Sequence, residues 1–294
     1  MSKGNLNKVQ KSAVEAFGRP VLIFAGAGSG KTRVLTHKIA HLIENNLVSA
    51  ENILAVTFTN KAAQEMKNRV KKLVKGKETV LNIGTFHSIC ARILRSEIHQ
   101  LNYTADFSIF DVQDQIALVK VVLEAMNIPK NYVTPQEVRH KISYFKNKLI
   151  HPDKATKKAH LVLEKNYANI YKNYQKALVD NNAVDFDDLL LLPLELFKKH
   201  PNILEKYRQK WQYILVDEYQ DTNKPQFMLM KYLAEDHQQI CVVGDDDQSI
   251  YGWRGADIRN ILDFEKNFGN CEVFKLEKNY RSSAHILEAA ASVV

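Results

Sequence analysis

A glycine-rich loop between an apolar run and an amphipathic stretch constrains the fold of this chain more than any other feature. The loop, residues 25–32, reads AGAGSGKT; it follows the apolar residues 21–24 and precedes the amphipathic residues 33–44. Glycines let backbone N–H groups converge on an anion, and the N-terminus of the following helix adds a partial positive charge. The order strand, loop, helix therefore predicts a phosphate-binding loop in a nucleoside triphosphate site.

Two side chains of this loop carry specific expectations. Lys31 can reach the β- and γ-phosphates, and Thr32 can bind Mg²⁺. The usual pattern begins with Gly where this chain has Ala25, a departure of one methyl group. The residues expected to contact the nucleotide phosphates are Ala27, Gly28, Ser29, Gly30, Lys31 and Thr32. The alternative interpretation is a Gly-rich strand-to-helix turn with an incidental lysine.

Length and composition indicate a globular chain of about two domains, since 294 residues of which 45% are hydrophobic can bury a sizeable core. The formal net charge of +8 favours a polyanionic partner, although a merely soluble basic protein would have the same charge. Cys90, Cys241 and Cys271 have no metal-ligand spacing and are expected to be buried thiols. With no signal sequence and no membrane-spanning run, we expect a cytoplasmic protein without a membrane partner.

The first hundred residues alternate between predicted strands and helices. A helix over 8–17, capped by Asn7, precedes the loop, and strands are expected at 53–58 and 80–83, with helices over 61–74 and from 84 to about 99. This alternation predicts an α/β fold with a parallel sheet covered on both faces.

From about residue 101 to 205 the pattern is helical, with a capping box at 134–137. Lysines and aromatic side chains are interleaved there, as single-stranded nucleic acid binding requires. Tyrosines at helical spacing are more often core residues, and lysines more often form a solvated face, so both interpretations stay open. The aromatic residues concerned are Tyr144, Phe145, Tyr167, Tyr171 and Tyr174.

The alternation resumes with an apolar strand at 213–216, which ends in Asp217 and Glu218. Parallel sheets bind ligands at the carboxyl ends of their strands, so this pair is expected beside the phosphate loop. Asp217 would hold Mg²⁺, and Glu218 would orient or deprotonate the attacking water.

A further buried strand is predicted at 240–243, followed by a loop with three acids and Gln248, and then by Trp253 and Arg254. Gln248 would respond to the γ-phosphate, while Trp253 and Arg254 would offer a stacking plane and a cation to a nucleic-acid strand. A strand at 272–276 and a helix after 279–283 complete the pattern.

In this combination the chain resembles the superfamily 1 helicases of the Rep, UvrD and PcrA group, and within that group Rep most. The resemblance covers nearly the whole chain, and members of this group tolerate alanine at the position of Ala25. The matching stretches are Gln10, 25–32, 57–63, 84–87, 184–188, 216–222, 243–255 and 279–282. The resemblance implies a RecA-like P-loop NTPase domain interrupted by an inserted all-helical domain.

The resemblance further implies an ATP-dependent DNA helicase that uses ATP and Mg²⁺ and moves 3′ to 5′ on single-stranded DNA. Its expected partners are single-stranded DNA, single/double-strand junctions, and replication or repair proteins. By the resemblance, Gln10 contacts the adenine edge, Arg33 and Tyr280 enclose the ring, and Arg281 contacts the γ-phosphate. The implied catalytic residues are Lys31, Glu218, Gln248 and Arg281. The implied DNA-binding residues are Phe58, Asn60, His87, Phe186, Tyr251, Trp253 and Arg254.

We expect residues 1–100 and 206–280 to form one motor domain, 101–205 the helical insertion, and 281–294 the start of a second motor domain. An apolar face near the end (Ile286, Leu287, Ala290, Val293 and Val294) has no later segment to cover it, so we expect an N-terminal fragment. Such a fragment should bind MgATP weakly, hydrolyse it very slowly and not unwind DNA. The alternatives are a nucleic-acid-binding module without useful catalysis, and a P-loop ATPase or kinase with no nucleic-acid role.

Overall fold

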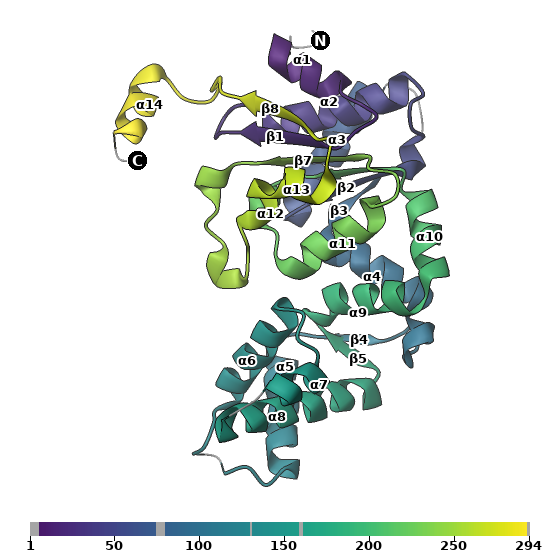
Figure 1. Cartoon of the computed structure of the whole chain (residues 1–294), viewed down its shortest axis with the longest axis vertical. Coiled ribbons are helices and arrows are strands. Elements are labelled where there is room, and N and C mark those ends of the chain that lie inside the picture. Colours follow the sequence, from purple (N-terminus) through teal and green to yellow (C-terminus); the bar gives the residue numbers. More distant parts are fainter. Residues whose placement is uncertain (1–5, 75–79, 130, 159–160, 293–294) are drawn as a thin grey trace. The chain divides into compact units, whose positions relative to one another are not determined.

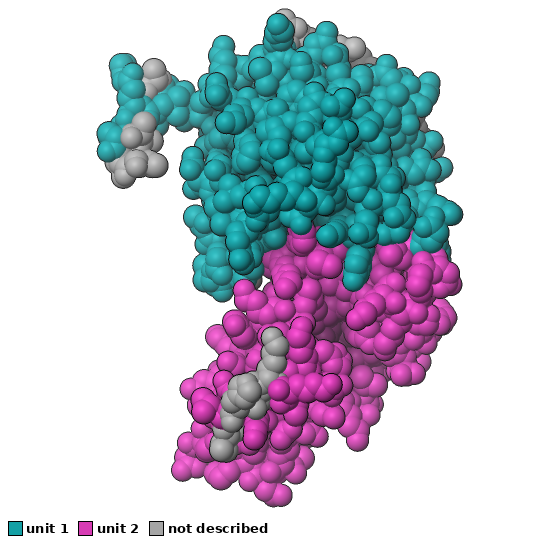
Figure 2. Space-filling model, viewed as in Figure 1, with its two compact units in different colours: residues 1–86, 205–222, 230–294 teal, residues 87–204, 223–229 magenta. Residues whose placement is uncertain are grey.

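The computed structural model describes residues 6–74, 80–129, 131–158 and 161–292. The chain divides into two compact units, coloured separately in Figure 2. Unit 1 consists of residues 1–86, 205–222 and 230–294, and unit 2 of residues 87–204 and 223–229. Unit 2 is thus an insertion into unit 1 in the sequence. It contains the predicted insertion, 101–205, except for its last residue, and takes in residues 87–100 and 223–229 as well.

Unit 1 is built on a six-stranded sheet with the order β3-β2-β6-β7-β1-β8 (Figure 1). Every neighbouring pair in this sheet is parallel. The strands are β1 Val21–Ala25, β2 Ile53–Thr57, β3 Asn82–Thr85, β6 Tyr213–Val216, β7 Ile240–Gly244 and β8 Glu272–Leu276. Strands from before and after the insertion are therefore interleaved, and the predicted α/β fold with a parallel sheet is confirmed.

Burial on both faces explains why the four central strands, β2, β6, β7 and β1, are nearly continuous apolar runs. One face packs against helices α1 Lys8–Glu15, α2 Lys31–Glu44 and α3 Asn60–Leu73. The strand side chains that contribute to this core include Val21, Ile23, Ile53, Ala55, Leu215 and Val243. The alternate positions Leu22, Leu54, Val56, Ile214 and Val242 are also buried.

Shorter elements follow the last strands of the sheet. The 3-10 helices η3 Tyr219–Asp221, η4 Asp246–Gln248 and η5 Gly252–Arg254 lie at or after strand ends. Helix α12 Arg259–Leu262 packs against η3, α13 Phe264–Phe268 follows it, and η1 Ala50–Asn52 precedes β2. Helix α14 is Ala284–Ala291; its Ile286 is exposed, and Val293 and Val294 lie outside the described residues.

Unit 2 is mainly helical, and most of the residues in its core cluster lie on α5 Val112–Ala125, α6 Pro135–Asn147 and α8 Val162–Asp180. Its other elements are η2 Ile98–Leu101, α7 Pro152–Lys158 and α9 Asp188–Lys199. Helices α4 Phe86–Glu97, α10 Pro201–Lys210 and α11 Lys224–Ala234 run across the divisions between the units.

Unit 2 differs from the all-helical insertion that the resemblance implies, and burial decides the open question for two of its tyrosines. β4 Ser108–Phe110 and β5 Ala183–Asp185 form a parallel pair, and strands of three residues are too short to show an alternating pattern in the sequence. Tyr171 and Tyr174 are buried in the helical core, so they present no face to a base. Among the described residues, no helix combines the length and apolar character that crossing a membrane requires.

Candidate functional site

The phosphate loop joins β1 to α2 in a conformation that depends on glycine. Gly28 and Gly30 have φ angles of +72° and +95°, which side-chain-bearing residues rarely adopt. A Cβ atom on Gly28 would lie 2.6 Å from the Cβ of Arg281. Ala25, by contrast, is a buried residue of β1 itself, so the position where the usual pattern has glycine tolerates a methyl group.

The buried hydroxyl oxygen of Ser29 has no hydrogen-bond partner among the described residues. Buried polar groups are almost always paired, so this hydroxyl fits a ligand such as a phosphate oxygen. The loop therefore has the backbone shape and an unsatisfied donor that a nucleotide phosphate would use.

Three segments far apart in the sequence meet at this loop. Gln10 donates from Nε2 to the Ser29 carbonyl oxygen at 2.9 Å, and Asn279 donates from Nδ2 to the Ala27 carbonyl oxygen at 2.5 Å. The Tyr280 backbone N–H donates to the Gly28 carbonyl oxygen at 2.9 Å. The predicted nucleotide residues 10, 27–30 and 280 are thus brought together.

The remaining predicted nucleotide residues lie on the same segments. Arg33 is half-buried on the first turn of α2, and Arg281 is exposed directly after Tyr280. The Tyr280 hydroxyl accepts a hydrogen bond from Asn7 Nδ2 at 2.8 Å. Gln10 is itself buried, and its Oε1 accepts from the Asn7 backbone N–H at 3.0 Å, so both ends of its amide have protein partners.

The buried lysine Lys38 holds α1 against the phosphate-loop helix, a role that the sequence did not reveal. It lies on α2 and donates from Nζ to the carbonyl oxygens of Ala13 at 2.9 Å and Ala16 at 2.6 Å. Ala13 lies in the last turn of α1 and Ala16 is the residue that ends it, and carbonyls at a helix end have no partner within the helix. Burial lowers the pKa of Lys38, and the two carbonyl oxygens compensate for its lost hydration.

The two predicted carboxylates lie at the end of β6, opposite the loop lysine. Lys31 Nζ is 3.2 Å from Glu218 Oε2. Glu218 has a φ of +50°, and its backbone N–H donates to Asp217 Oδ1 at 3.1 Å. Burial, and next the charge of Glu218, raises the pKa of Asp217 to about 7.

Hard oxygen ligands of this kind suit Mg²⁺, which usually binds one or two protein groups and keeps several waters. Asp217 and Thr32 supply a carboxylate and a hydroxyl of the required type at the loop. Among the described residues, no group of three or more His, Cys, Asp or Glu could hold a metal ion, so a larger all-protein cage is not seen. The donor chemistry therefore fits Mg²⁺ bound partly by the nucleotide.

Gln220 links these carboxylates to the loop after β7, and sequence reasoning gave it no role although it lies two residues after Glu218. Its Nε2 donates to Glu218 Oε2 at 2.9 Å, and its Oε1 accepts from the Asp245 backbone N–H at 3.0 Å. A Cβ atom on Gly244 would lie 2.6 Å from this Oε1, so glycine allows the close approach. Predicted Gln248 donates from Nε2 to Asp245 Oδ2.

The same loop carries Tyr251 and Trp253, and Phe58, which directly follows β2, packs against Tyr251. Phe58 and Tyr251 stack with ring centroids 5.4 Å apart, and Trp253 lies 6.3 Å from Tyr251 and is 75% exposed. The Asp221 carboxylate accepts a hydrogen bond from the Tyr251 backbone. Asn60 is exposed at the start of α3. The side chain of Arg254 lies outside what the structure describes.

Unit 2 carries the other two predicted DNA-binding residues as a stacked pair. His87 and Phe186 have ring centroids 3.9 Å apart with an angle of 23° between their planes. Phe186 is 54% exposed. Burial lowers the pKa of His87 to about 4, so its ring is neutral near pH 7 and suited to stacking.

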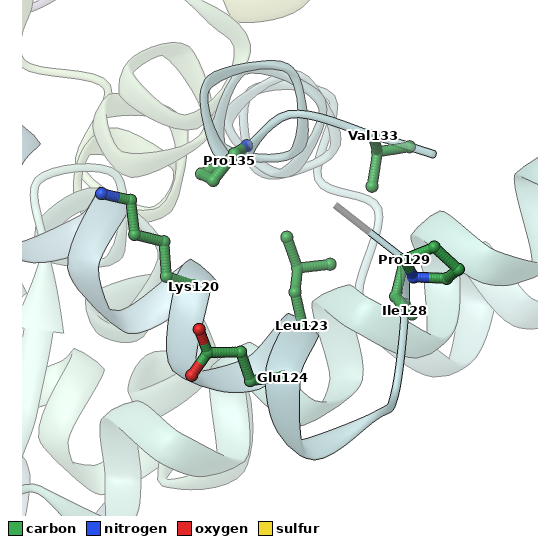
Figure 3. A pocket seen from close by; sticks show the side chains of 7 residues that line it. All are labelled: Lys120, Leu123, Glu124, Ile128, Pro129, Val133 and Pro135. Carbon is green, nitrogen blue, oxygen red and sulfur yellow. The ribbon is translucent and has the colours of Figure 1, made fainter. Parts of the chain in front are cut away.

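The described cavity lies elsewhere in unit 2. It has a volume of about 320 Å³ and is bordered by α5 and the start of α6 (Figure 3). The residues that line it are Lys120, Leu123, Glu124, Ile128, Pro129, Val133 and Pro135. None of the predicted site residues is among these seven. The nucleotide site is recognised instead by the conformation of its phosphate loop and by its polar contacts.

Comparison with protein families matches residues 6–269 to the UvrD/REP helicase N-terminal domain. Among individual proteins, the chain is 49% identical over 289 residues to the ATP-dependent DNA helicase PcrA of Bacillus subtilis. It is 50% identical over 290 residues to the protein of that name from Staphylococcus epidermidis, and 49% identical to that from Staphylococcus aureus. These matches cover 98–99% of this chain but only 39–40% of each relative. The narrower likeness to Rep stays a prediction.

Proposed function

Because the chain belongs to the UvrD/REP helicase family, we propose that it carries the ATP-binding lobe and part of the single-strand path of an ATP-dependent DNA helicase. The observation that carries this proposal is the hydrogen-bonded chain from Lys31 through Glu218 and Gln220 to the loop of Asp245. It connects a phosphate loop to the loop that bears Tyr251 and Trp253. Such a connection is what a motor needs to make its grip on DNA depend on nucleotide.

The site residues divide the work by their chemistry. Lys31 leaves Glu218 for a phosphate oxygen when nucleotide binds, because a triphosphate carries more negative charge than one carboxylate. Glu218, released from the ion pair, orients the attacking water or accepts its proton. Thr32 and Asp217 would hold Mg²⁺, which would neutralise negative charge on the nucleotide. Gln248 and Arg281 stabilise the γ-phosphate.

The residues around the base and the strand are proposed to position the two ligands. The adenine is held by Gln10, Arg33 and Tyr280. To bind it, Gln10 exchanges one of its hydrogen bonds within the protein for a hydrogen bond to the base. Phe58, Tyr251 and Trp253 in unit 1, and His87 and Phe186 in unit 2, each offer an aromatic face to a base of the strand. Asn60 and Arg254 add polar contacts to the strand.

We propose that the whole helicase moves 3′ to 5′ on single-stranded DNA, acts at single/double-strand junctions in the cytoplasm, and works with replication or repair proteins. The chain spans about two fifths of its relatives, so the segment alone is proposed to bind MgATP weakly and hydrolyse it slowly. Slow hydrolysis is expected because, in other NTPases, an additional arginine that stabilises the transition state raises the rate of phosphoryl transfer roughly 10³- to 10⁵-fold.

Substitution of Trp253 tests the strand role. Titration of a fluorescent single-stranded oligonucleotide should show that Trp253→Ala weakens binding about 5- to 150-fold, since one stacked base is worth about 1–3 kcal/mol. The affinity for a MgATP analogue should stay within about twofold, because Trp253 is not among the proposed nucleotide residues. Tyr132→Ala is the control, as it removes an exposed aromatic ring on unit 2 that has no proposed DNA contact.

The two alternatives predict other results. Strand binding that is weakened by Trp253→Ala but identical with and without nucleotide would support a DNA-binding module without coupling. Strand affinity unaffected by Trp253→Ala, Phe58→Ala and Phe186→Ala together would contradict the proposal and favour an ATPase with no nucleic-acid role.

A further inference from the structure

The turn that carries Phe186 is unusual in its burial pattern. Phe186 is exposed, yet Asp185 before it and Asp188 after it are each only 2% exposed. Asp185 ends β5 and Asp188 begins α9, so the turn is a tight connection between two elements. Two buried acids thus flank one displayed aromatic ring, which stacks on His87.

Lys146 of α6 lies between the two acids. Its Nζ is 2.6 Å from Asp185 Oδ2 and 2.8 Å from Asp188 Oδ1, and the lysine is fully buried. Asp185 Oδ1 also accepts the Asp188 backbone N–H at 2.8 Å, which closes the turn and caps the start of α9. One ammonium group therefore fixes both ends of the turn from which Phe186 projects.

Neighbouring side chains complete this arrangement, which we call the Lys146 cluster (Lys146, Tyr174, Gln175, Asp185 and Asp188). The Tyr174 hydroxyl donates to Asp185 Oδ2 at 3.1 Å, and Gln175 Nε2 donates to Asp188 Oδ2 at 3.0 Å. Tyr174 and Gln175 are adjacent on α8, so α6 and α8 both hold the turn.

Asn147, next to Lys146, reaches the residue that follows Phe186. Its Nδ2 donates to Asp187 Oδ1 at 3.0 Å, and its Oδ1 accepts from Asn223 Nδ2 at 2.8 Å. The three acids of the turn, Asp185, Asp187 and Asp188, are therefore each bonded by a side chain of α6.

The charges make this cluster sensitive to the loss of its lysine. Burial alone would lower the pKa of Lys146, but Asp185 and Asp188 raise it well above its ordinary value, so the ammonium stays charged. Burial and the charge of Asp185 raise the pKa of Asp188 to about 6. Without Lys146 the two carboxylates would be buried side by side with no counter-charge, and the turn would have to open or bind protons.

A merely stabilising role explains this cluster poorly. A buried ion cluster is often no more stabilising than apolar side chains of the same size, so stability alone gives little reason for one. What the cluster does in addition is fix the direction of a single exposed ring. We propose that Lys146 is a positioning residue: it locks the 185–188 turn so that Phe186, stacked on His87, presents its free face to a base of the DNA strand. This inference rests on the proposed function.

Four variants of the full chain test this inference with a single-stranded oligonucleotide that contains 2-aminopurine, whose fluorescence falls when it stacks. Phe186→Ala should weaken binding about 5- to 150-fold and reduce the quenching. Lys146→Met should do the same. Tyr174→Phe, which removes one hydroxyl and keeps the ring, should give a smaller loss in the same direction. Lys148→Met is the matched control, since Lys148 directly follows α6 and is exposed.

Two readouts separate positioning from charge loss and from general destabilisation. Lys146 is buried and cannot contact phosphate, so Lys146→Met should leave the slope of log affinity against log salt unchanged, whereas losing one phosphate-contacting lysine lowers it by about one. In a Phe186→Ala background, Lys146→Met should cause no further loss of affinity, because it acts through that ring.

The outcomes distinguish this inference from the proposed function. If Phe186→Ala leaves affinity and quenching unchanged, the proposed strand contact of Phe186 is wrong, and the positioning role is wrong with it. If Phe186→Ala weakens binding but folded Lys146→Met and Tyr174→Phe bind and quench normally, only the positioning role is overturned. Should Lys146→Met not fold, Tyr174→Phe decides: normal affinity and quenching overturn the inference, and a joint loss supports it.

Discussion

Single side chains at the nucleotide site show how burial sets their ionisation. In the folded chain the pKa of Asp217 is raised to about 7 from an ordinary 3.8, first by burial and then by Glu218. The unfolded chain therefore releases this proton near pH 4, whereas the folded chain retains it until near pH 7. Folding is increasingly opposed as the pH rises through this window, because the folded state must bury a charge.

Asp217→Asn should therefore stabilise the chain in the absence of nucleotide and Mg²⁺. We expect the free energy of unfolding of unit 1 to rise by about 2–4 kcal/mol at pH 8, and the gain to shrink as the pH falls towards 4. Urea unfolding followed by tryptophan fluorescence measures this unit alone, because Trp211 and Trp253 both belong to it. Asp246→Asn, at an exposed acid nearby, is the control. A gain of equal size at pH 5 and pH 8 would rule out ionisation as the cause.

Among the elements, α1 depends on its neighbour more than on its own sequence. It has only eight residues, too few for a stable isolated helix, and its last-turn carbonyls are bonded by Lys38 of α2. The same helix carries Gln10, whose amide is bonded to the phosphate loop. The buried lysine therefore ties the proposed adenine-binding residue to the phosphate-binding helix.

Lys38→Met should consequently affect the nucleotide base more than the phosphates. The loss of two charged hydrogen bonds, about 1.5–3 kcal/mol each when intact, should let α1 fray and Gln10 move. We expect ADP affinity to fall about 3- to 10-fold and the preference for ADP over GDP to narrow, as measured by calorimetric titration. Lys11→Met, at an exposed position on α1, should change neither. An unaltered base preference in folded Lys38→Met would show that Gln10 is positioned without Lys38.

Elements were predictable where their residues are buried and their runs are long. Strands β1, β2, β6 and β7 coincide with apolar runs in the sequence, whereas β8 alternates in burial and β3 begins two residues later than the strand predicted at 80–83. Thr134 and Asn7 begin helices as their capping patterns predict. The three-residue strands β4 and β5 were not predicted, because each needs its partner to be a strand at all. The approach of Glu218 to the phosphate loop, 187 residues away from Lys31, followed from the rule for strand ends, whereas the contacts of Lys38 and Lys146 gave no local signal.

At the scale of the whole molecule, two hydrophobic clusters among the described residues share no residue. The cluster around Val21, Leu35 and Leu215 lies entirely in unit 1, and the cluster around Val138, Ile142 and Tyr174 lies entirely in unit 2. Regions of a protein that open locally tend to coincide with separate clusters of this kind, because each cluster buries its own apolar surface. The proposed nucleotide residues all belong to unit 1, whereas the proposed DNA residues are divided between the units.

Nucleotide should therefore stabilise the two units unequally. A ligand that binds only the folded state adds to its stability by mass action, about 2.7 kcal/mol at one hundred times its dissociation constant. Hydrogen exchange followed by mass spectrometry, with and without MgADP, should show slower exchange in α1, in β1 to α2 and in β6 to η3. Exchange in α5, α6 and α8 should be unchanged.

A variant that cannot hold the phosphates supplies the control for this experiment. Lys31→Ala removes the only charged side chain of the phosphate loop, so the same MgADP concentration should give it little or no added protection. Equal slowing of exchange in α6 and in α2 of the unsubstituted chain would mean that the two cores open together. That result would contradict the assignment of nucleotide stabilisation to unit 1. Nucleotide would then also raise the stability of unit 2, which carries His87 and Phe186.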